Sequence, residues 1–245
     1  MSGHSKWATI KRKKGAIDAK RGKIFNTLIK EIQVAARSGG GDLDANPRLR
    51  TAVAAAKANN MPNDNINKAI QRGTGELPGV HYEESSYEGF GPGGAAILIE
   101  CMTDNKQRTV AEIRHLFSKY NGSLAENGAV SWMFDEKGVF TFDSNVIDEE
   151  SLLDHVIESG AEDMKTEDSM FDVYCTPKDF HTVQEYFENK GIKFENAEMA
   201  KVPQNIHQVE QKDINSLMKL LDALEDLDDV QKVWANIEID DESDV

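Results

Sequence analysis

The residues best suited to chemistry are the cations of the first 37 residues, which could bind phosphate groups. A helical pattern begins near Asp18, and its cations fall opposite its apolar side at 100° per residue. The cation row is Lys20, Lys23, Lys30 and Arg37. The apolar side is Ile24, Phe25, Leu28, Ile29, Ile32, Ala35 and Ala36, with Val34 on the basic side and Arg21 on the apolar side. We expect the apolar side to pack and the cation row to face solvent or phosphates.

A polar, glycine-containing arm precedes this helix and carries one aromatic residue, Trp7. Such an aromatic in a basic segment suits stacking on an unpaired base, while lysines follow the phosphates. The alternative is that the arm folds back and buries Trp7 on the helices. The full set of predicted nucleic-acid-binding residues is His4, Lys6, Trp7, Lys11, Arg12, Lys13, Lys14, Lys20, Arg21, Lys23, Lys30, Arg37, Arg48 and Arg50.

The charge of the chain is strongly divided. Residues 1–80 hold 15 Lys and Arg against 6 Asp and Glu, whereas the remainder holds 13 against 37. The net charge of the whole chain is −15. A locally basic part in an acidic protein indicates an electrostatic footprint for nucleic acid. The competing interpretation is that the basic part docks on the acidic remainder.

The run from Gly89 to Gly94, GFGPGG, matches the dinucleotide-binding pattern GxGxxG letter for letter. That mechanism needs the last glycine to open a helix, whereas here a strand follows and Pro92 lacks an amide hydrogen. A tight turn between two strands explains the glycines better. Contact of this loop with a ribose or phosphate is the second interpretation.

No catalytic or metal-binding arrangement stands out. The histidines are scattered, and Cys101 and Cys175 have no ligand or disulfide spacing. The acidic residues of 143–172 and 222–244 are typical of solvated helix faces and an acidic tail. No membrane span or signal peptide is evident. We therefore expect a cytoplasmic protein that is not an enzyme and has no cofactor and no metal.

The helices near the N-terminus form a small bundle. Asn46 and Pro47 indicate an N-cap and first helical position for a helix at about 47–60, and a third helix follows at 64–72. No short turn followed by a helix of base-reading side chains, as in a helix-turn-helix, is evident. Residues 74–80 are a linker.

The remaining elements predict two α/β units. Residues 138–200 follow the order βαββαβ of a ferredoxin-like unit. A second copy results if strands at 95–102, 129–134 and about 200–204 join the helices 105–120 and 212–225 and the final strand. The fold class is α+β, with an N-terminal three-helix bundle and two ferredoxin-like α/β domains, the last inserted into the middle one. The expected domains are 1–78, 79–136 plus 201–245, and 137–200.

Several long motifs resemble the YebC family, and the likeness covers essentially the whole chain. They are GHSKWATIK, DAKRGKIF, SGGGDLDANPRLR, YEGFGPGGAAILIE, DNKQRTVAEIRH and LEDLDDVQKVW. The resemblance implies a helical bundle with two ferredoxin-like domains and no established catalytic residues. It also implies a DNA-binding transcriptional regulator, although some members and the mitochondrial relatives act on the ribosome at proline-containing stretches.

We therefore expect a cytoplasmic nucleic-acid-binding regulator of gene expression, with DNA-binding transcriptional control as the first hypothesis. The second is a ribosome-associated translation factor that binds ribosomal RNA. The expected partners are DNA or ribosomal RNA, with the polymerase or the ribosome, and no membrane. The sequence does not set the oligomeric state, and a monomer is the simplest expectation.

Overall fold

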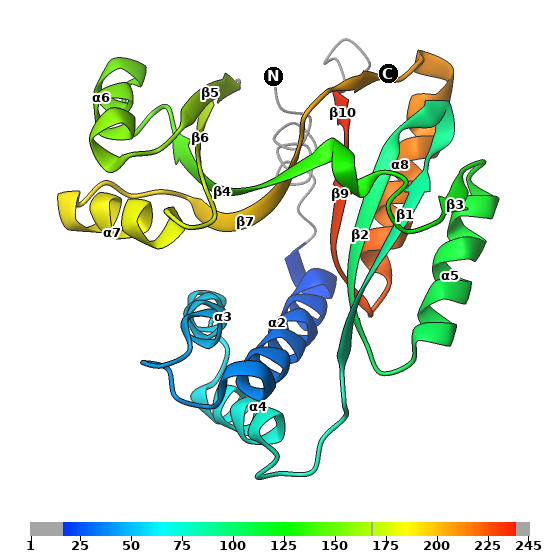
Figure 1. The fold of residues 1–245 in the computed structure, drawn as a ribbon, viewed down its shortest axis with the longest axis horizontal. Helices are drawn as coiled ribbons and strands as arrows, with labels where there is room; N and C mark the ends of the chain where they lie inside the picture. The colour runs from blue at the N-terminus through cyan, green and yellow to red at the C-terminus, as the bar shows by residue number, and fades with distance from the viewer. Residues whose placement is uncertain (1–16, 168, 239–245) are drawn as a thin grey trace.

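The computed structural model describes residues 17–167 and 169–238, with residues 17–21, 167 and 238 as backbone only. Three parts are visible in Figure 1: a helical bundle below and two sheets with their helices above. The fold is α+β, as predicted, with two four-stranded antiparallel sheets.

The bundle consists of helices α2 (Ile17–Gly39), α3 (Pro47–Ala58) and α4 (Asn63–Thr74). The side chain of Asn46 caps α3 as predicted, because it accepts a hydrogen bond from the Leu49 amide at 3.0 Å. The three helices share a core of apolar residues such as Ile32, Leu49 and Ile66. Ile24 departs from the expected apolar side, since it is 40% exposed.

The middle sheet has the strand order β3-β1-β2-β9 and carries two helices on one face. Its strands are β1 (Glu83–Phe90), β2 (Ala96–Thr103), β3 (Ser123–Ala125) and β9 (Val230–Ala235). Its helices are α5 (Lys106–Lys119) and α8 (Gln211–Asp226). The second four-stranded sheet and its helices lie between β3 and α8 in the chain. Because β9 follows them but pairs with β2, this third part is inserted into the middle one.

One strand of the middle sheet is not where the sequence predicted it. The expected strand at 129–134 is wrong: the edge strand is β3, and a 3-10 turn occupies Ser131–Met133. The reason is the buried carboxylate of Glu88, which accepts hydrogen bonds from the amides of Gly128, Val130 and Ser131. Those amides are therefore held by a side chain rather than by a neighbouring strand.

The prediction that residues 200–204 join the middle sheet is also wrong. They belong to β7 (Asn196–Pro203), which pairs with β4 in the other sheet. The place between β2 and β3 is filled by β1, which pairs with both. With β1 there, the spatial order of a ferredoxin-like sheet is complete even though β1 comes first in the chain.

The inserted part has the predicted order βαββαβ and the sheet order β5-β6-β4-β7. Its remaining elements are β4 (Phe134–Asp143), α6 (Glu149–Ser159), β5 (Asp163–Glu167), β6 (Met170–Cys175) and α7 (Phe180–Lys190). An aromatic core that includes Phe140, Phe142 and Phe187 lies between this sheet and its two helices. A small pair of strands, β8 (His207–Gln208) and β10 (Ile237–Glu238), completes the fold.

The three parts are joined in two different ways. The sheet faces that carry no helices pack on each other through apolar residues such as Leu98, Val139 and Trp234. In contrast, every buried member of the bundle's apolar cluster lies within residues 32–69. Among the described residues, hydrogen bonds and ion pairs connect the bundle to the middle part.

Candidate nucleic-acid interface

Helix α2 carries three of the predicted phosphate-binding cations at intervals of seven residues, and all three bind the middle part of the chain. The Lys23 ammonium donates to the carbonyl of Leu227 at 2.8 Å. The Arg37 guanidinium donates to the carbonyl of Tyr82, in the approach to β1, at 3.3 Å. A spacing of seven keeps these side chains on one side of the helix, which is thus a docking surface.

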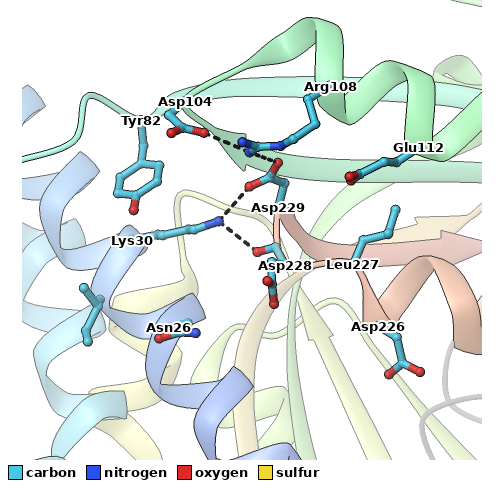
Figure 2. A pocket seen from close by; sticks show the side chains of 11 residues that line it. Asn26, Lys30, Tyr82, Asp104, Arg108, Glu112, Asp226, Leu227, Asp228 and Asp229 are labelled. Carbon is cyan, nitrogen blue, oxygen red and sulfur yellow. Dashed lines mark hydrogen bonds and ion pairs between the residues drawn. The ribbon is translucent and has the colours of Figure 1, made fainter.

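Lys30 is the centre of this contact and is only 8% exposed. Its ammonium donates to the carbonyl of Asp228 at 2.8 Å and to the Asp229 carboxylate at 2.9 Å (Figure 2). It also donates to the carbonyl of Met102 at 3.2 Å. All three of its hydrogens thus have acceptors within the chain. The expectation that the cation row faces solvent is wrong for Lys30, because the loop before β9 covers it.

Asp229 is the acceptor that makes burial of Lys30 possible. It is 5% exposed, and its second oxygen accepts from Arg108 at 2.6 Å, Thr109 at 2.8 Å and Thr103 at 3.1 Å. Burial alone would raise the pKa of this carboxyl, but the hydrogen bonds from Arg108, Lys30 and Thr109 outweigh it and lower the pKa to about 2. The interpretation of 222–244 as solvated acids is wrong for Asp229.

A cavity of about 660 Å³ lies beside this contact, between α2 and the middle part. Figure 2 shows Asp104, Glu112, Asp226 and Asp228 around it, in addition to Asp229. The only cations in its lining are Lys30 and Arg108, and both bind Asp229. An acidic cavity repels phosphate, so its charge disfavours nucleic acid on this side of α2.

The two predicted cations of α3 also have partners in the chain. Arg48 binds Glu31 of α2 at 2.7 Å and Glu84 of β1 at 2.6 Å, and its pKa is raised, chiefly by the hydrogen bond to Glu31. Arg50 donates to the carbonyl of Leu43 at 3.1 Å. Arg48 therefore forms a second tie between the bundle and the middle sheet.

The rest of the predicted interface lies at the N-terminus. His4, Lys6, Trp7, Lys11, Arg12, Lys13 and Lys14 lie outside the described residues, as do the side chains of Lys20 and Arg21. Residues 1–21 hold seven Lys and Arg against one Asp, whereas 22–80 hold eight against five. Most of the positive excess of the bundle thus precedes the docked part of α2.

The GFGPGG run is a turn between two strands, as the sequence indicated. It joins β1 to β2 through a single turn at Pro92–Gly94, in which Gly93 and Gly94 have φ of 72° and 85°. The Gly91 amide donates to the carbonyl of Ala95 at 2.8 Å, and the His207 ring contacts the carbonyl of Gly93 at 2.7 Å. The glycines are explained by this geometry without a nucleotide.

The described residues contain no group of three His, Cys, Asp or Glu side chains placed to hold a metal ion. Cys101 and Cys175 are buried free thiols, and burial raises their pKa values to about 12 and about 11. Between residues 17 and 238, apart from 168, no helix has the length and apolar character to cross a bilayer.

Comparison with known proteins places these features in a family. Residues 5–76 match the N-terminal domain of the TACO1/YebC proteins, and residues 82–237 match their second and third domains. The chain belongs to the TACO1/YebC family. Residues 77–81, between the two matches, connect the end of the bundle to the approach to β1.

Relatives of this TACO1/YebC protein cover nearly its whole length. A protein of Desulforapulum autotrophicum is 55% identical over 99% of this chain and 98% of its own, and one of Syntrophus aciditrophicus is 56% identical over 99% and 97%. Both are named as a "Probable transcriptional regulatory protein". The crystal structure of a conserved hypothetical protein from Aquifex aeolicus is 44% identical, with a TM-score of 0.86 over 93% of this chain and 94% of that one.

The sequence did not reveal the acceptors that hold the α2 cations. Asp229 and Arg108 lie in the motifs LEDLDDVQKVW and DNKQRTVAEIRH. In the sequence these motifs supported the family resemblance, and no role was predicted for their residues. One signal in the sequence could have indicated that the basic side of α2 is docked: the apolar residue Val34 lies on that side. It is 6% exposed, as expected of a residue on a helix side that packs against another part of the chain.

Proposed function

We propose that this TACO1/YebC protein is a nucleic-acid-binding regulator of gene expression that contacts phosphates mainly through residues 2–21. The observation that carries this proposal is the separation of its cations. Lys23, Lys30 and Arg37 are held by the middle part, whereas seven further Lys and Arg precede them with a single Asp. The names of the relatives favour a role in transcription, for which DNA is the expected target.

Helix α4 supplies a candidate for base contact that the sequence did not suggest. Asparagine is a poor helix former, yet Asn63, Asn65 and Asn67 lie in the first turns of α4, and Gln71 follows. All four are exposed, and their side-chain amides make no hydrogen bond to another described residue. Asparagine and glutamine amides pair with adenine edges in the major groove, which would account for their presence on an exposed helix.

Ribosomal RNA is the second candidate target, and Trp7 favours it. An aromatic among cations suits unpaired bases, which are common in folded RNA and absent from duplex DNA. In-cell crosslinking with sequencing of both recovered DNA and RNA separates the two. Discrete DNA peaks support transcriptional control, and one ribosomal RNA site without DNA peaks supports a role in translation.

The salt dependence of binding tests the phosphate contacts. For roughly five contacts, the slope of log K against log salt should be about −4 to −5 on duplex DNA and about −3.5 on single strands. Changing Lys11, Arg12, Lys13 and Lys14 to Gln should reduce the magnitude of this slope.

The matched control changes four exposed lysines of the acidic parts, Lys119, Lys178, Lys193 and Lys219, to Gln. It alters the net charge equally and should keep the wild-type slope. A slope near zero for the wild type, or equal slopes for both variants, would contradict the proposal.

A further inference from the structure

Helix α6 lies in the inserted part, at the upper left of Figure 1. It carries exposed apolar side chains. Of the seven large apolar residues exposed in the described chain, three lie in one short stretch: Val146 at 64%, Leu153 at 46% and Ile157 at 70%. Leu153 and Ile157 are four residues apart and share one side of α6. Apolar side chains that cluster on a surface indicate a site of interaction.

Leu153 and Ile157, which we call the exposed pair, lie on the side of α6 that faces away from α7. His155 faces α7, because its ring nitrogen lies 2.8 Å from the Tyr186 hydroxyl, while Leu152 and Val156 enter the core. On the other flank, Glu149 accepts a hydrogen bond from Thr166 of β5 at 2.9 Å. Residues four apart lie on the same side of a helix, so Leu153 lies near Glu149 and Ile157 lies near Leu153. The exposed pair is therefore on the flank of α6 that faces β5.

Strand β5 is the outer strand of its sheet. It pairs with β6 on one side, and no other strand of the described chain pairs with its second side. Such an edge presents backbone N–H and C=O groups that another extended segment can pair with. The exposed pair on α6 and the edge of β5 together form what we call the α6–β5 surface, which comprises Leu153, Ile157 and residues 163–166.

The surroundings of the α6–β5 surface are strongly acidic. Residues 143–166 contain eight Asp and Glu and one Lys. Two of these carboxylates, Glu158 and Glu162, pair with Lys190 and Lys137 from outside the stretch. The lysine within the stretch, Lys165, lies 5.5 Å from the ring centre of Tyr174, which packs on the sheet face opposite to the helices. The side that carries α6 is therefore free of lysine and arginine in this stretch.

We propose that the α6–β5 surface binds an extended, lysine- and arginine-rich segment of a partner protein. The segment adds a strand to the edge of β5 and places alternate apolar side chains against Leu153 and Ile157. The open edge requires an extended backbone, the exposed pair requires apolar side chains, and the carboxylates require cations. A second copy of this chain fits poorly, because a two-fold contact would set acidic surface against acidic surface. This inference is independent of the proposed function.

The test uses the full chain and a ten-residue peptide in which Lys and Arg alternate with Val and Ile. Amide chemical shifts measured by NMR should change in residues 150–166 when the peptide is added. The double variant L153S/I157S should lower peptide affinity by roughly tenfold. The matched control is L77S/V80S, which removes two exposed apolar side chains in the linker and should leave the affinity unchanged.

A second peptide, N-methylated at alternate amides, keeps the charge and the side chains but cannot pair as a strand. It should bind roughly tenfold more weakly than the unmodified peptide. Equal affinity of the two peptides, equal affinity of L153S/I157S and the wild type, or shifts centred on α8 would overturn the proposal. So would the absence of binding at millimolar peptide. Because both substituted side chains are exposed, a wild-type melting temperature is expected for L153S/I157S.

Discussion

At the residue scale, Asp229 connects Lys30 of the bundle to three side chains of the middle part. One carboxylate oxygen binds Lys30, and the other accepts from Arg108, Thr103 and Thr109. A buried ion pair is costly to desolvate, and this one is sustained because every donor has an acceptor. Residues from α2, β2 and α5 are thus tied to the loop before β9.

Replacing Asp229 with Asn should lower the free energy of unfolding by about 3 kcal/mol, because Lys30 would stay buried without a counter-charge. The folded pKa of about 2 lies below the ordinary value, so the contribution is complete above about pH 4 and is lost as the pH falls toward 2. Urea denaturation at several pH values measures both effects. Asp228→Asn is the control, since only its carbonyl binds Lys30. Equal stability of the two variants would contradict the assignment.

Glu88 has a similar role in the loop before β4. Burial would raise the pKa of this carboxyl, but hydrogen bonds from the amides of Gly128, Val130 and Ser131 outweigh it and lower the pKa. Glu88→Gln should therefore destabilise the protein by about 1–3 kcal/mol at neutral pH.

The lowered pKa sets the sign of the pH effect for Glu88. Its contribution is complete above the ordinary pKa of a glutamate and is lost as the pH falls through the lowered value, so variant and wild type should converge in acid. Thermal unfolding at neutral and acidic pH tests this. Glu126→Gln, at an exposed site in the same loop, should have no effect, and a loss as large as that of Glu88→Gln would contradict the assignment.

At the element scale, strand β1 decides how the middle sheet is assembled. Its last residues pair with β2 through the Gly91–Ala95 turn and with β3 on the other side. Gly89 lies where β1 crosses α5, and a Cβ there would come within 2.6 Å of the Phe117 ring and 2.7 Å of the Ser123 carbonyl. The absence of a side chain at Gly89 is what permits this close packing.

Gly89→Ala should destabilise the protein by about 1–3 kcal/mol, because the Ser123 backbone and the buried Phe117 ring cannot both move aside. Gly22→Ala, in helix α2, is the comparison. A Cβ there meets no atom of the described residues within 4 Å, and the change should stabilise the helix by about 0.5–1 kcal/mol. Chemical denaturation of both variants gives the two values. A neutral effect of Gly89→Ala would mean that β1 and α5 pack less closely than described.

At the scale of the whole molecule, the two junctions between the parts differ in kind. An apolar cluster joins the two sheets, whereas hydrogen bonds and ion pairs beside a cavity join the bundle to the middle part. Polar interfaces between domains permit relative motion more readily than apolar ones. The bundle is therefore the part most able to separate without unfolding the rest.

Hydrogen exchange should reveal this difference. In the Asp229→Asn variant, amides of α2 and of residues 226–230 should exchange faster, while those of β4, β6 and β7 should keep wild-type protection. Asp228→Asn again serves as the control. Faster exchange spread evenly over all three parts would contradict the prediction that the bundle separates more readily than the two sheets do.

The sequence alone determined the elements whose signals are local. The cap at Asn46, the proline at 47 and the helical periodicity act within a few residues, and they placed the bundle helices and the βαββαβ unit close to where they lie. The division of charge along the chain and the turn at GFGPGG could also be predicted from the sequence. The tertiary structure alone decided what the α2 cations bind, because the partners of Lys30 lie 72 and 199 residues away in the chain. It also decided the place of β1, since strand pairing depends on contacts between distant segments that no local pattern encodes.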